Sequence, residues 1–563
     1  MLKRSLIALA ITSTLLVGCN EDDAVEVIKE VEVVKEVVKE IEVTPTPVTQ
    51  VKNVILMIGD GMGAQQVGLL EEYARRAPNS TYNSMNNETA LTRLGHAGQL
   101  GLSLNAPFGA NGSLVVDSAC SASQLATGVA AGSEMIGLDD KGNIVETILE
   151  KAKKAGKATG LVSDTRITHA TPAAFASHQP HRSLEPAIAE ELISTGMVDV
   201  MLSGGARVFL PSDIKTNDES RQLMADLGAP TSVYKKSKRS DERNLIIEAK
   251  EAYGYNLAFD GAQLDSVSGD KILGLFANSG MADGIAYTAC KADKSCSQPS
   301  LRDMTLKALE VLSQDEDGFF LMIEGGQIDW AGHVNDAGWM LHELLKFDEA
   351  VDAVYEWVKD RNDTLVVVTA DHETGSFGFS YSRKDLPEGK FLNGDGMQSR
   401  EYKPNFNFGS LNNLDRLHAQ TGTFYDMMSQ VNSDWDFSNT LGKEWADAVN
   451  AHSDFKISDQ QGDAITEREA NEYHVDGHKY LSATEFPKIN DFKEFFVYGD
   501  ELHANLIGRA LSADQNVVWG TGTHTAAPVP VYVFGPQGIT QQFSTMQHHV
   551  DIANKMMVAL LAE

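Results

Sequence analysis

Six long apolar runs recur along the chain from residue 51 onward, and several of them end in a glycine, an acid or a histidine. Continuous rather than alternating runs are typical of parallel strands that helices cover on both faces. Helical patterns separate some of the runs, at 143–155 and 340–359. The pattern predicts an α/β fold, a three-layer sandwich with a mainly parallel central sheet and helices on both faces. The runs are NVILMIGDGMG (53–63), ATGLVSDT (158–165), VDVMLSGG (198–205), GFFLMIEGG (318–326), TLVVVTADHE (364–373) and VPVYVFGP (529–536).

Polar residues concentrate where these runs end. The stretch 319–336, FFLMIEGGQIDWAGHVND, passes from an apolar run to Glu324, two glycines, Asp329, Trp330 and His333. In open α/β sheets, ligands bind beyond the carboxyl ends of the strands. The costly polar groups at the mouth of the core are therefore expected to form a binding site.

The N-terminus resembles an export signal. Lys3 and Arg4 precede an apolar run from Leu6 to Val17, which is too short to span a bilayer. The run ends in LVGC, which resembles a bacterial lipoprotein box, so residues 1–18 are expected to be a lipoprotein signal peptide and Cys19 the acylated first residue. Asn20, rather than Asp, follows the cysteine, and in this the chain resembles lipoproteins that are sorted to an outer membrane. An ordinary secretory signal is the alternative.

Residues 19–50 are a low-complexity Val/Glu/Lys tract that closes with Pro45 and Pro47. Some of its valines fall at heptad spacing, but about two heptads rich in β-branched residues are a weak coiled coil. We expect a tether, because the prolines isolate the tract from the domain beyond them; an ordered first element of the domain is the alternative. Residues 51–563 are then expected to form the folded domain.

Composition limits the partners of the protein. The 563-residue chain is 42% hydrophobic, has 79 acidic against 47 basic residues and carries a formal charge of −32. Phosphate backbones are bound by Lys and Arg, so no nucleic-acid partner is expected, and the acidic surface serves solubility.

The cysteines predict one disulfide. Cys290 and Cys296 bracket a short polar loop, and an exported compartment permits them to pair. Cys120 lies in a segment of small residues that suits a buried helix, so a buried free thiol is expected. The cysteine spacing shows no metal site.

Three strand ends carry groups that bind metals. Asp329 and His333 are spaced i, i+4, so they share one face if DWAGH opens a helix. Asp371 and His372 follow another strand, and Asp60 lies between two glycines at the end of the first. Taken singly, each set has a structural explanation such as a helix cap or a turn. Together they imply divalent cations, because unpaired charges at a core boundary are costly.

The candidate nucleophile is Ser118 in VVDSACSASQLATG. Its hydroxyl would lie at the positive end of a small-residue helix, where an anion is favoured, although a simple N-cap is the alternative. The segment VSDTRITHATPAAFASHQPHRS adds His169, Thr171 and Arg182. A guanidinium can hold a phosphate through two hydrogen bonds.

The ordered set of motifs resembles the alkaline phosphatase family. GDGMG, DSACSASQLATG, THATPAAFASH, IEGGQIDWAGH, TADHETG and GTGTHTAAPVPVYVFGP occur in the family's order over residues 54–536. The resemblance implies a metal-dependent phosphatase that cleaves small phosphate monoesters. It implies that Ser118 becomes phosphorylated and that Arg182 binds the phosphate.

The resemblance also implies two Zn²⁺ ions and one Mg²⁺ ion. The implied ligands of one zinc are Asp329, His333 and His524, those of the second are Asp60, Asp371 and His372, and those of magnesium are Asp60, Thr171 and Glu324, with Ser118 beside the metals. Two zinc ions can hold the attacking and leaving oxygens of an in-line displacement, so Ser118 needs no histidine base.

Two positions and one insertion resemble Vibrio-type members of the family. His169 and Trp330 occupy positions beside the metal ligands where other bacterial members carry Asp and Lys. The long interval between His372 and GTGTH resembles the extended loop that reaches over the partner subunit in Vibrio-type enzymes. We therefore expect an insertion at about 376–510, anchored by aromatic residues, that packs on a second subunit of a homodimer and narrows access to the metals. A lobe folded on its own subunit is the alternative.

Rival functions remain open on the sequence alone. A phosphodiesterase of the same superfamily would keep the metal ligands, whereas a sulfatase would need a Cys/Ser-x-Pro-x-Arg motif that DSACS lacks. A non-catalytic metal-binding surface lipoprotein is the non-enzyme alternative. Closed structural zinc sites rarely keep a free Ser and Arg at one point, which favours the enzyme.

Overall fold

The structure, a computed structural model, describes residues 50–561. The expected signal peptide, Cys19 and nearly all of the expected tether lie outside the described residues. Within the described part of the chain, no helix combines the length and the apolar character that a membrane crossing requires.

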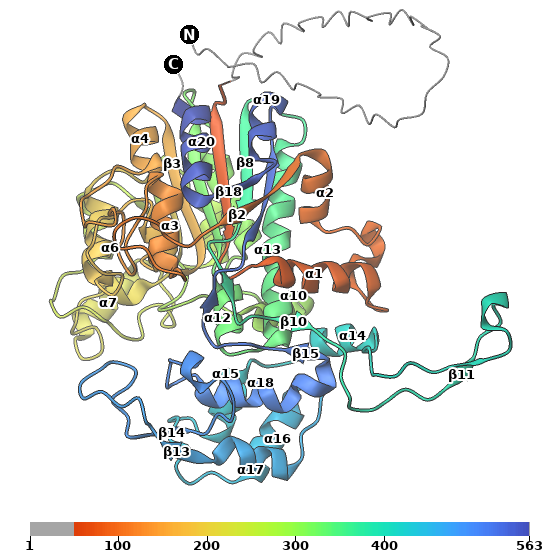
Figure 1. Cartoon of the computed structure of the whole chain (residues 1–563). Coiled ribbons are helices and arrows are strands. Elements are labelled where there is room, and N and C mark those ends of the chain that lie inside the picture. Colours follow the sequence, from red (N-terminus) through yellow and green to blue (C-terminus); the bar gives the residue numbers. More distant parts are fainter. Residues whose placement is uncertain (1–49, 562–563) are drawn as a thin grey trace, which may run out of the picture. The chain divides into compact units, whose positions relative to one another are not determined.

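The core of the molecule is a ten-stranded sheet (Figure 1). All six predicted runs contribute a strand to it, which confirms the predicted α/β fold. In spatial order the strands are β18 (Met546–His548), β2 (Gln99–Leu104), β17 (Val529–Phe534), β8 (Thr364–Thr369), β1 (Asn53–Gly59), β7 (Phe319–Gly325), β3 (Ala158–Arg166), β4 (Val200–Gly204), β6 (Ile272–Leu275) and β5 (Asn256–Ala258).

One strand runs against the others. The run at 529–536 has the pattern of a parallel strand, but β17 pairs antiparallel with both β2 and β8. A strand buried on both faces reads as a continuous apolar run in either direction, so the pattern could not reveal this reversal. Because β17 is reversed, the residues that precede it, His524 among them, lie at the sheet edge where β1 and β8 end.

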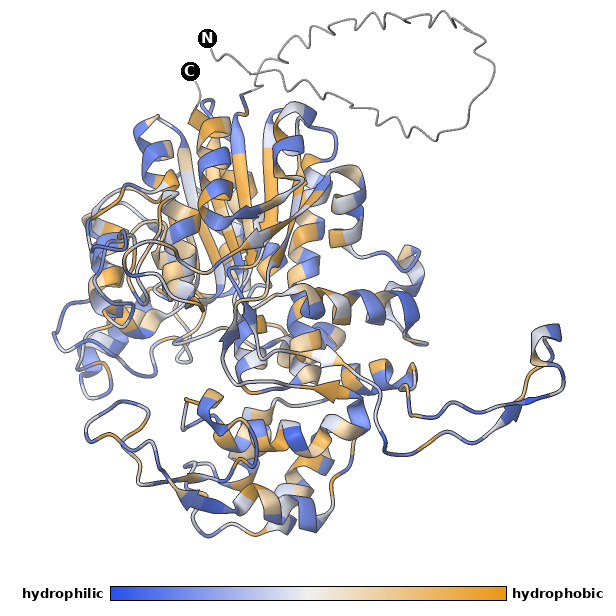
Figure 2. Cartoon of the chain, viewed as in Figure 1, coloured by the Kyte–Doolittle hydropathy of each residue, from blue (hydrophilic) through white to orange (hydrophobic). Residues whose placement is uncertain are grey.

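Both faces of the sheet are buried under helices. Along β1, Ile55 and Met57 belong to one apolar core, while Val54, Leu56 and Ile58 belong to the other. This alternation between two cores explains why the run is apolar at every position. Figure 2 shows the apolar residues concentrated on the central strands and on the helix surfaces that face them.

The first core is covered by α1 (Ala64–Arg76), α2 (Ala90–Ala97), α9 (Gly261–Ser266), α10 (Gly284–Asp293), α11 (Leu301–Leu312), α12 (Gln327–His333) and α13 (Ala337–Val358). The second is covered by α3 (Ser118–Thr127), α4 (Ile148–Lys154), α5 (Ala170–Ala173), α6 (Glu185–Ser194), α7 (Asp218–Asp226), α8 (Leu245–Glu251), α19 (Gln537–Thr540) and α20 (His549–Leu561). The predicted helix at 340–359 corresponds to α13. The one at 143–155 is shorter and begins after Thr147, whose side chain and Glu150 form a capping box.

The insertion is ordered and contains two parts. Its larger part, the helical lobe, comprises α14 (Asn412–His418), α15 (Phe424–Val431), α16 (Gly442–His452), α17 (Asp459–Thr466), β13 (Arg468–Ala470), β14 (Glu485–Pro487) and α18 (Leu502–Gln515). Buried residues of the lobe, such as Phe424, Trp445 and Ile507, belong to the same apolar core as Leu341 of α13. The lobe therefore packs on its own chain, as in the alternative interpretation of the insertion.

The smaller part of the insertion is an exposed arm, residues 383–406. It carries the strands β11 (Lys390–Phe391) and β12 (Glu401–Tyr402), which pair with each other, and it extends away from the helical lobe in Figure 1. Ser382 and Asn407 close its base through two backbone hydrogen bonds of 2.8 and 3.0 Å. Partner contact stays a prediction for this arm.

The cysteine predictions are confirmed for the described residues. Cys290 and Cys296 form a disulfide at the end of α10, and Cys120 is a buried free thiol in α3. Burial raises the pKa of the Cys120 thiol, and the nearby Asp117 carboxylate raises it further. An un-ionised thiol is a poor nucleophile and metal ligand, so Cys120 serves packing.

Candidate active site

The expected site residues gather at one edge of the central sheet. Asp60 directly follows β1, Glu324 lies near the end of β7, and Asp371 and His372 follow β8. Ile58 of β1 is in register with Glu324 on one side and with Thr369 on the other. The parallel register of three neighbouring strands thus brings their terminal acids together, as the position of the acids predicted.

Helix α12 adds two more ligand-type residues. Asp329 and His333 share one face of this helix, and His333 Nε2 lies 3.3 Å from Asp329 Oδ2. His524, in the short strand β16 (His524–Thr525), completes this side of the site. Its Nε2 lies 3.2 Å from His333 Nε2 and 3.5 Å from Asp329 Oδ1. The predicted i, i+4 pair is therefore joined by a histidine from a distant segment.

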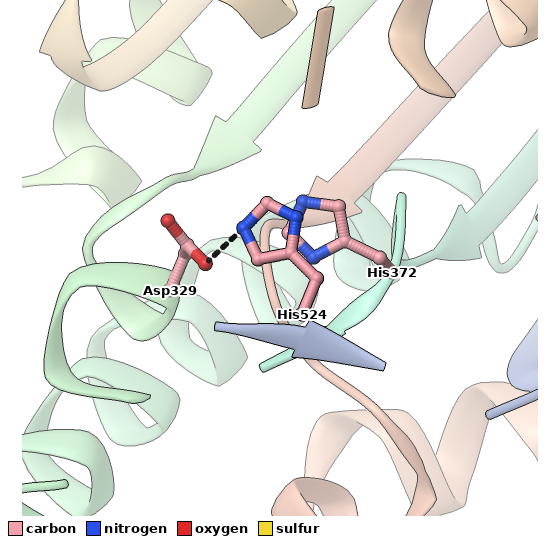
Figure 3. Close-up of side chains that lie close together, drawn as sticks. All are labelled: Asp329, His372 and His524. Carbon is pink, nitrogen blue, oxygen red and sulfur yellow. Dashed lines mark ion pairs between the residues drawn. The ribbon is translucent and has the colours of Figure 1, made fainter. Parts of the chain in front are cut away.

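The pairing of β16 with β9 (Glu373–Thr374) places His524 against His372. Figure 3 shows the two imidazoles beside the Asp329 carboxylate. Their rings are stacked, and the ring centroids lie 3.5 Å apart. Thr374 Oγ1 donates a hydrogen bond of 2.5 Å to Asp329 Oδ1. One small β-pair thus links residues near 372 with residues near 524.

Three groups of side chains bring ligand atoms close enough to share a cation. They are Asp60, Asp371 and His372; Asp329, His372 and His524; and Asp60, His169 and Glu324. The first group coincides with an expected zinc site. The second group contains His372 in place of the expected His333. His333 is nevertheless in direct contact with both Asp329 and His524.

The third group adds His169 to the expected pair of Asp60 and Glu324. Thr171, expected beside Asp60 and Glu324, donates a hydrogen bond of 3.3 Å from Oγ1 to Asp60 Oδ2. His169, expected only next to the ligands, is itself close enough to Asp60 and Glu324 to act as one. His169 directly precedes α5, so both residues enter the site from the same turn.

Carboxylates in the site strongly perturb one another. Burial, followed by the charge of Asp371, raises the pKa of Asp60 well above its usual range. Burial and the charge of Asp329 raise the pKa of Asp371 to about 8, and burial raises that of Glu324 to about 7. Without a cation these acids are costly to ionise together.

The histidines divide into two electrostatic classes. Burial, followed by the charge of His524, lowers the pKa of His372 well below its usual range, so its imidazole is neutral. Burial alone would lower the pKa of His333, but the Asp329 carboxylate outweighs burial and raises it to about 9. In the absence of a metal, a proton on His333 thus balances Asp329; a metal ion would replace that proton.

Several oxygens in the site have no protein donor. Asp60 Oδ1, Glu324 Oε1 and Asp371 Oδ2 are buried and lack a hydrogen-bond partner among the described residues. The other oxygen of Glu324 accepts hydrogen bonds from Ser163 and Thr165, which fix the carboxylate. Oriented carboxylate oxygens and neutral imidazoles are the donor set that zinc and magnesium take in proteins, so the residues fit these ions.

Ser118 lies at the start of α3 and is buried. Asp117, not Ser118, caps this helix, since its carboxylate accepts from the backbone N–H of Ala119 at 2.9 Å. The Ser118 hydroxyl is therefore not used as a cap, and its Oγ lies 3.2 Å from His372 Nε2. Ser118 thus points at the carboxylate and imidazole cluster.

Arg182 reaches the same place from the loop before α6. Its guanidinium lies 3.2 Å from His169 Nε2 and 3.6 Å from Asp117 Oδ1. Trp330 packs edge-on against His169, with ring centroids 6.0 Å apart. All the predicted site residues within the described part of the chain are therefore brought together.

The structure adds site residues that sequence reasoning missed. Tyr498 and Glu501, from the helical lobe, both lie against His333: the ring centroids of Tyr498 and His333 are 5.2 Å apart, and Glu501 Oε2 is 4.0 Å from His333 Nδ1. They belong to no motif, and only the tertiary contact of the lobe with α12 reveals them.

Comparison with known proteins agrees with this arrangement. The alkaline phosphatase family model matches residues 51–562. Alkaline phosphatase 3 of Bacillus subtilis is 29% identical over 518 residues, covering 91% of this chain and 89% of the relative. The Escherichia coli alkaline phosphatase is 32% identical over 363 residues, covering 58% of this chain and 70% of the relative.

Solved structures show the same fold. The alkaline phosphatase of Thermus thermophilus superposes with a TM-score of 0.68 at 23% identity, covering 91% of this chain and 92% of that one. A cold-active alkaline phosphatase from Shewanella sp. gives 0.62 at 24% identity, covering 90% and 99%. With the family model matched over nearly all of the described residues, the chain belongs to the alkaline phosphatase family.

Proposed function

We propose that this chain cleaves phosphate monoesters by transferring the phosphoryl group to Ser118 and then to water. The activity itself follows from family membership, which makes the chain a phosphomonoesterase. The role of Ser118 rests on one observation. Its hydroxyl does not cap α3 and lies 3.2 Å from His372 in the carboxylate and imidazole cluster.

Alkaline phosphatases use two zinc ions and one magnesium ion, and the site offers groups that fit them. We assign one zinc to Asp329, His333 and His524, and the other to Asp60, Asp371 and His372. Asp60, Thr171 and Glu324 are assigned to magnesium, with His169 in reach of the same ion. Such metal sites stabilise attacking and leaving oxygens in phosphoryl transfer and lower the pKa of bound water.

The protein groups around Ser118 suit an in-line displacement. Ser118 Oγ gives up its proton and forms a bond to phosphorus while the ester P–O bond breaks, and the leaving oxygen takes up one proton as the alcohol. The Arg182 guanidinium, which lies 3.6 Å from Asp117 at the start of α3, supplies positive charge for the equatorial oxygens. Burial of Ser118 excludes competing water from the nucleophile.

Hydrolysis of the phosphoserine completes the cycle. Water attacks the phosphorus, the bond to Ser118 Oγ breaks, one proton of the water returns to Ser118 Oγ, and inorganic phosphate leaves with the other. Before this hydrolysis, the alcohol has left from the side of the phosphorus opposite Ser118. We propose that Asp329, His333 and His524 form that side. His372 Nε2, which contacts Ser118 Oγ, also lies 3.5 Å from Asp60 Oδ1 and 3.2 Å from Asp371 Oδ2. These two carboxylate oxygens, which have no donor, therefore lie on the Ser118 side of the site.

The protein acts as a homodimer in this proposal, and the exposed arm makes the contact. The arm leaves large apolar side chains in solvent, with Phe391 at 72% exposure, and Phe408 just beyond its base at 67%. A two-stranded hairpin is only marginally stable on its own in water. A second copy of the chain would bury this surface.

The proposed location is the outside of a bacterial inner membrane or the outer membrane, with a lipid on Cys19. The support is the sequence: a short apolar run behind two basic residues, ending in LVGC, and a low-complexity tether at 19–50 that separates the lipid from the domain.

The metal assignment predicts how stability depends on pH. Acids with raised pKa values are protonated in the metal-free fold and ionised in the unfolded chain, so the fold binds more protons and loses stability as pH rises. His333, with its pKa raised to about 9, acts in the same direction. Between about pH 7 and 9, the chelated protein should lose several degrees of melting temperature.

Protein saturated with zinc and magnesium should show a flat profile over the same range, because the ions replace the protons. Thermal melts of both forms test this. Equal slopes for the chelated and loaded proteins would contradict the assignment.

Ser118→Ala should lower kcat for phosphate monoesters at least about 1,000-fold, because the covalent route is lost. Its melting temperature and its bound zinc should match the parent. Ser113→Ala, on the exposed loop before α3, is the matched control and should keep full activity. Turnover near that of the parent in Ser118→Ala would refute the nucleophile.

The arm can be removed cleanly, because Ser382 and Asn407 are already paired. Replacing residues 383–406 by a two-residue turn should shift the protein toward monomer in sedimentation while zinc content is kept. Phe391→Asp should weaken the dimer in the same direction. Leu306→Asp, an exposed apolar site on α11, is the control and should leave the dimer intact. An undiminished dimer without the arm would rule out this contact.

Cys19→Ser should abolish lipid attachment. The parent should partition into the detergent phase and the variant into the aqueous phase, at equal specific activity after solubilisation. A parent protein found only in the aqueous phase, cleaved elsewhere than before Cys19 by mass spectrometry, would establish an ordinary secretory signal instead.

A further inference from the structure

One aromatic residue of the helical lobe stands on the metal-ligand side of the site. The Tyr498 ring meets the His333 imidazole edge-on, with centroids 5.2 Å apart and planes at 80°. Tyr498 is partly exposed, so a part of its surface is free of protein contact. It comes from the same chain as His333.

The segment that carries Tyr498 is held firmly against the loop that carries His524. The Phe495 carbonyl accepts hydrogen bonds from Thr521 Oγ1 at 2.8 Å and from the Gly522 N–H at 3.3 Å. Gly522 in turn accepts a hydrogen bond of 2.8 Å at its carbonyl oxygen from His333 Nδ1. Tyr498 is thus fixed relative to the ligands rather than carried on a free loop.

Tyr498 stands on the Asp329 side of the site, because the His333 imidazole that it contacts lies 3.3 Å from the Asp329 carboxylate. In the proposed function this is the side from which the alcohol departs.

A second ring extends this aromatic surface outward. Tyr480 packs edge-on against Tyr498, with centroids 5.0 Å apart. Tyr480 also lines a cavity of about 560 Å³, together with Gly499 and Asp500, which directly follow Tyr498. Other parts of its wall are Trp435, Phe486 and Arg468. The aromatic surface therefore leads from His333 into a cavity of the lobe.

We propose that Tyr498 is a specificity-determining residue that contacts the leaving group of the substrate and favours aromatic alcohols. This inference rests on the proposed function, because it takes the Asp329, His333 and His524 side as the side from which the alcohol departs. Tyr498 offers a ring that an aryl group can pack against, with Tyr480 behind it. Larger aromatic alcohols extend toward the cavity in the lobe.

The size of the effect follows from the chemistry of aromatic contacts. One well-placed aromatic pair contributes an amount that corresponds to roughly a two- to tenfold change in affinity. Inorganic phosphate has no leaving group and cannot gain from it. The contact should therefore separate ligands with an aryl group from ligands without one.

The test compares two inhibitors and two substrates on the metal-loaded full chain. For Tyr498→Leu, the inhibition constant of phenylphosphonate should rise about fivefold, while that of inorganic phosphate stays within about twofold. The kcat/KM for phenyl phosphate should fall about fivefold relative to that for glycerol phosphate. Tyr498→Phe, which keeps the ring, should behave as the parent. Zinc content should not change.

Tyr473→Leu is the matched control, because Tyr473 lies in the same lobe, is 44% exposed and bonds Glu494 instead of the site. It should leave both ratios unchanged. Equal losses for both inhibitors in Tyr498→Leu would show a structural role, and no loss for either would show no contact; both overturn the proposal. If Tyr498→Leu does not fold, Tyr480→Leu replaces it, with a smaller shift in the same direction expected and an unchanged ratio overturning the proposal.

Failure of the proposed function would look different. Full activity in Ser118→Ala would remove the phosphoserine route, yet the phosphonate comparison, which measures binding alone, would still report whether Tyr498 touches an aryl group.

Discussion

The burial of several carboxylates at one edge of the sheet is the constraint on which the rest of this structure depends. Asp60, Glu324 and Asp371 end three neighbouring strands and face one another without donors for several of their oxygens. Burial raises the pKa of each acid, because the protein alone stabilises the ionised forms poorly. The fold supplies rigidity instead: register fixes the strand ends, and Ser163 and Thr165 fix the Glu324 carboxylate. Cations can then neutralise a geometry that already exists.

Rigidity at this edge comes from segments that are far apart in the chain. The reversed strand β17 delivers His524, the β9–β16 pair holds it beside His372, and α12 presents Asp329 and His333 together. The site is therefore a product of the whole sheet. A substitution that shifts one strand would be felt by several ligands at once, since packed cores transmit strain.

Local pattern predicted six of the ten strands of the central sheet and some of the helices around it, whereas most of the expected site residues came from the ordered family motifs together with the polar strand ends. Apolar runs with polar ends imply strands and a site, and the spacing of Asp329 and His333 needs only one helical turn. The direction of β17, the closeness of His169 to Asp60 and the contact of Tyr498 with His333 could not be predicted. Each depends on how distant segments pack. The local sequence around an apolar run or a tyrosine does not specify which distant residue it will contact.

The hydrogen bond from Asn505 of α18 to the backbone carbonyl of His333 has a consequence for heat inactivation. Asn505 Nδ2 donates to His333 O at 2.7 Å and to Asn335 Oδ1 at 3.1 Å. These hydrogen bonds from the helical lobe stabilise the last turn of α12. Cooperative units of a protein open with different free energies, and a peripheral helical layer opens before a central sheet. Opening of the lobe would free the end of α12 and with it His333, the proposed metal ligand, while the ten-stranded sheet stays folded. We therefore expect the docking of this lobe to contribute to the lifetime of the active enzyme on heating.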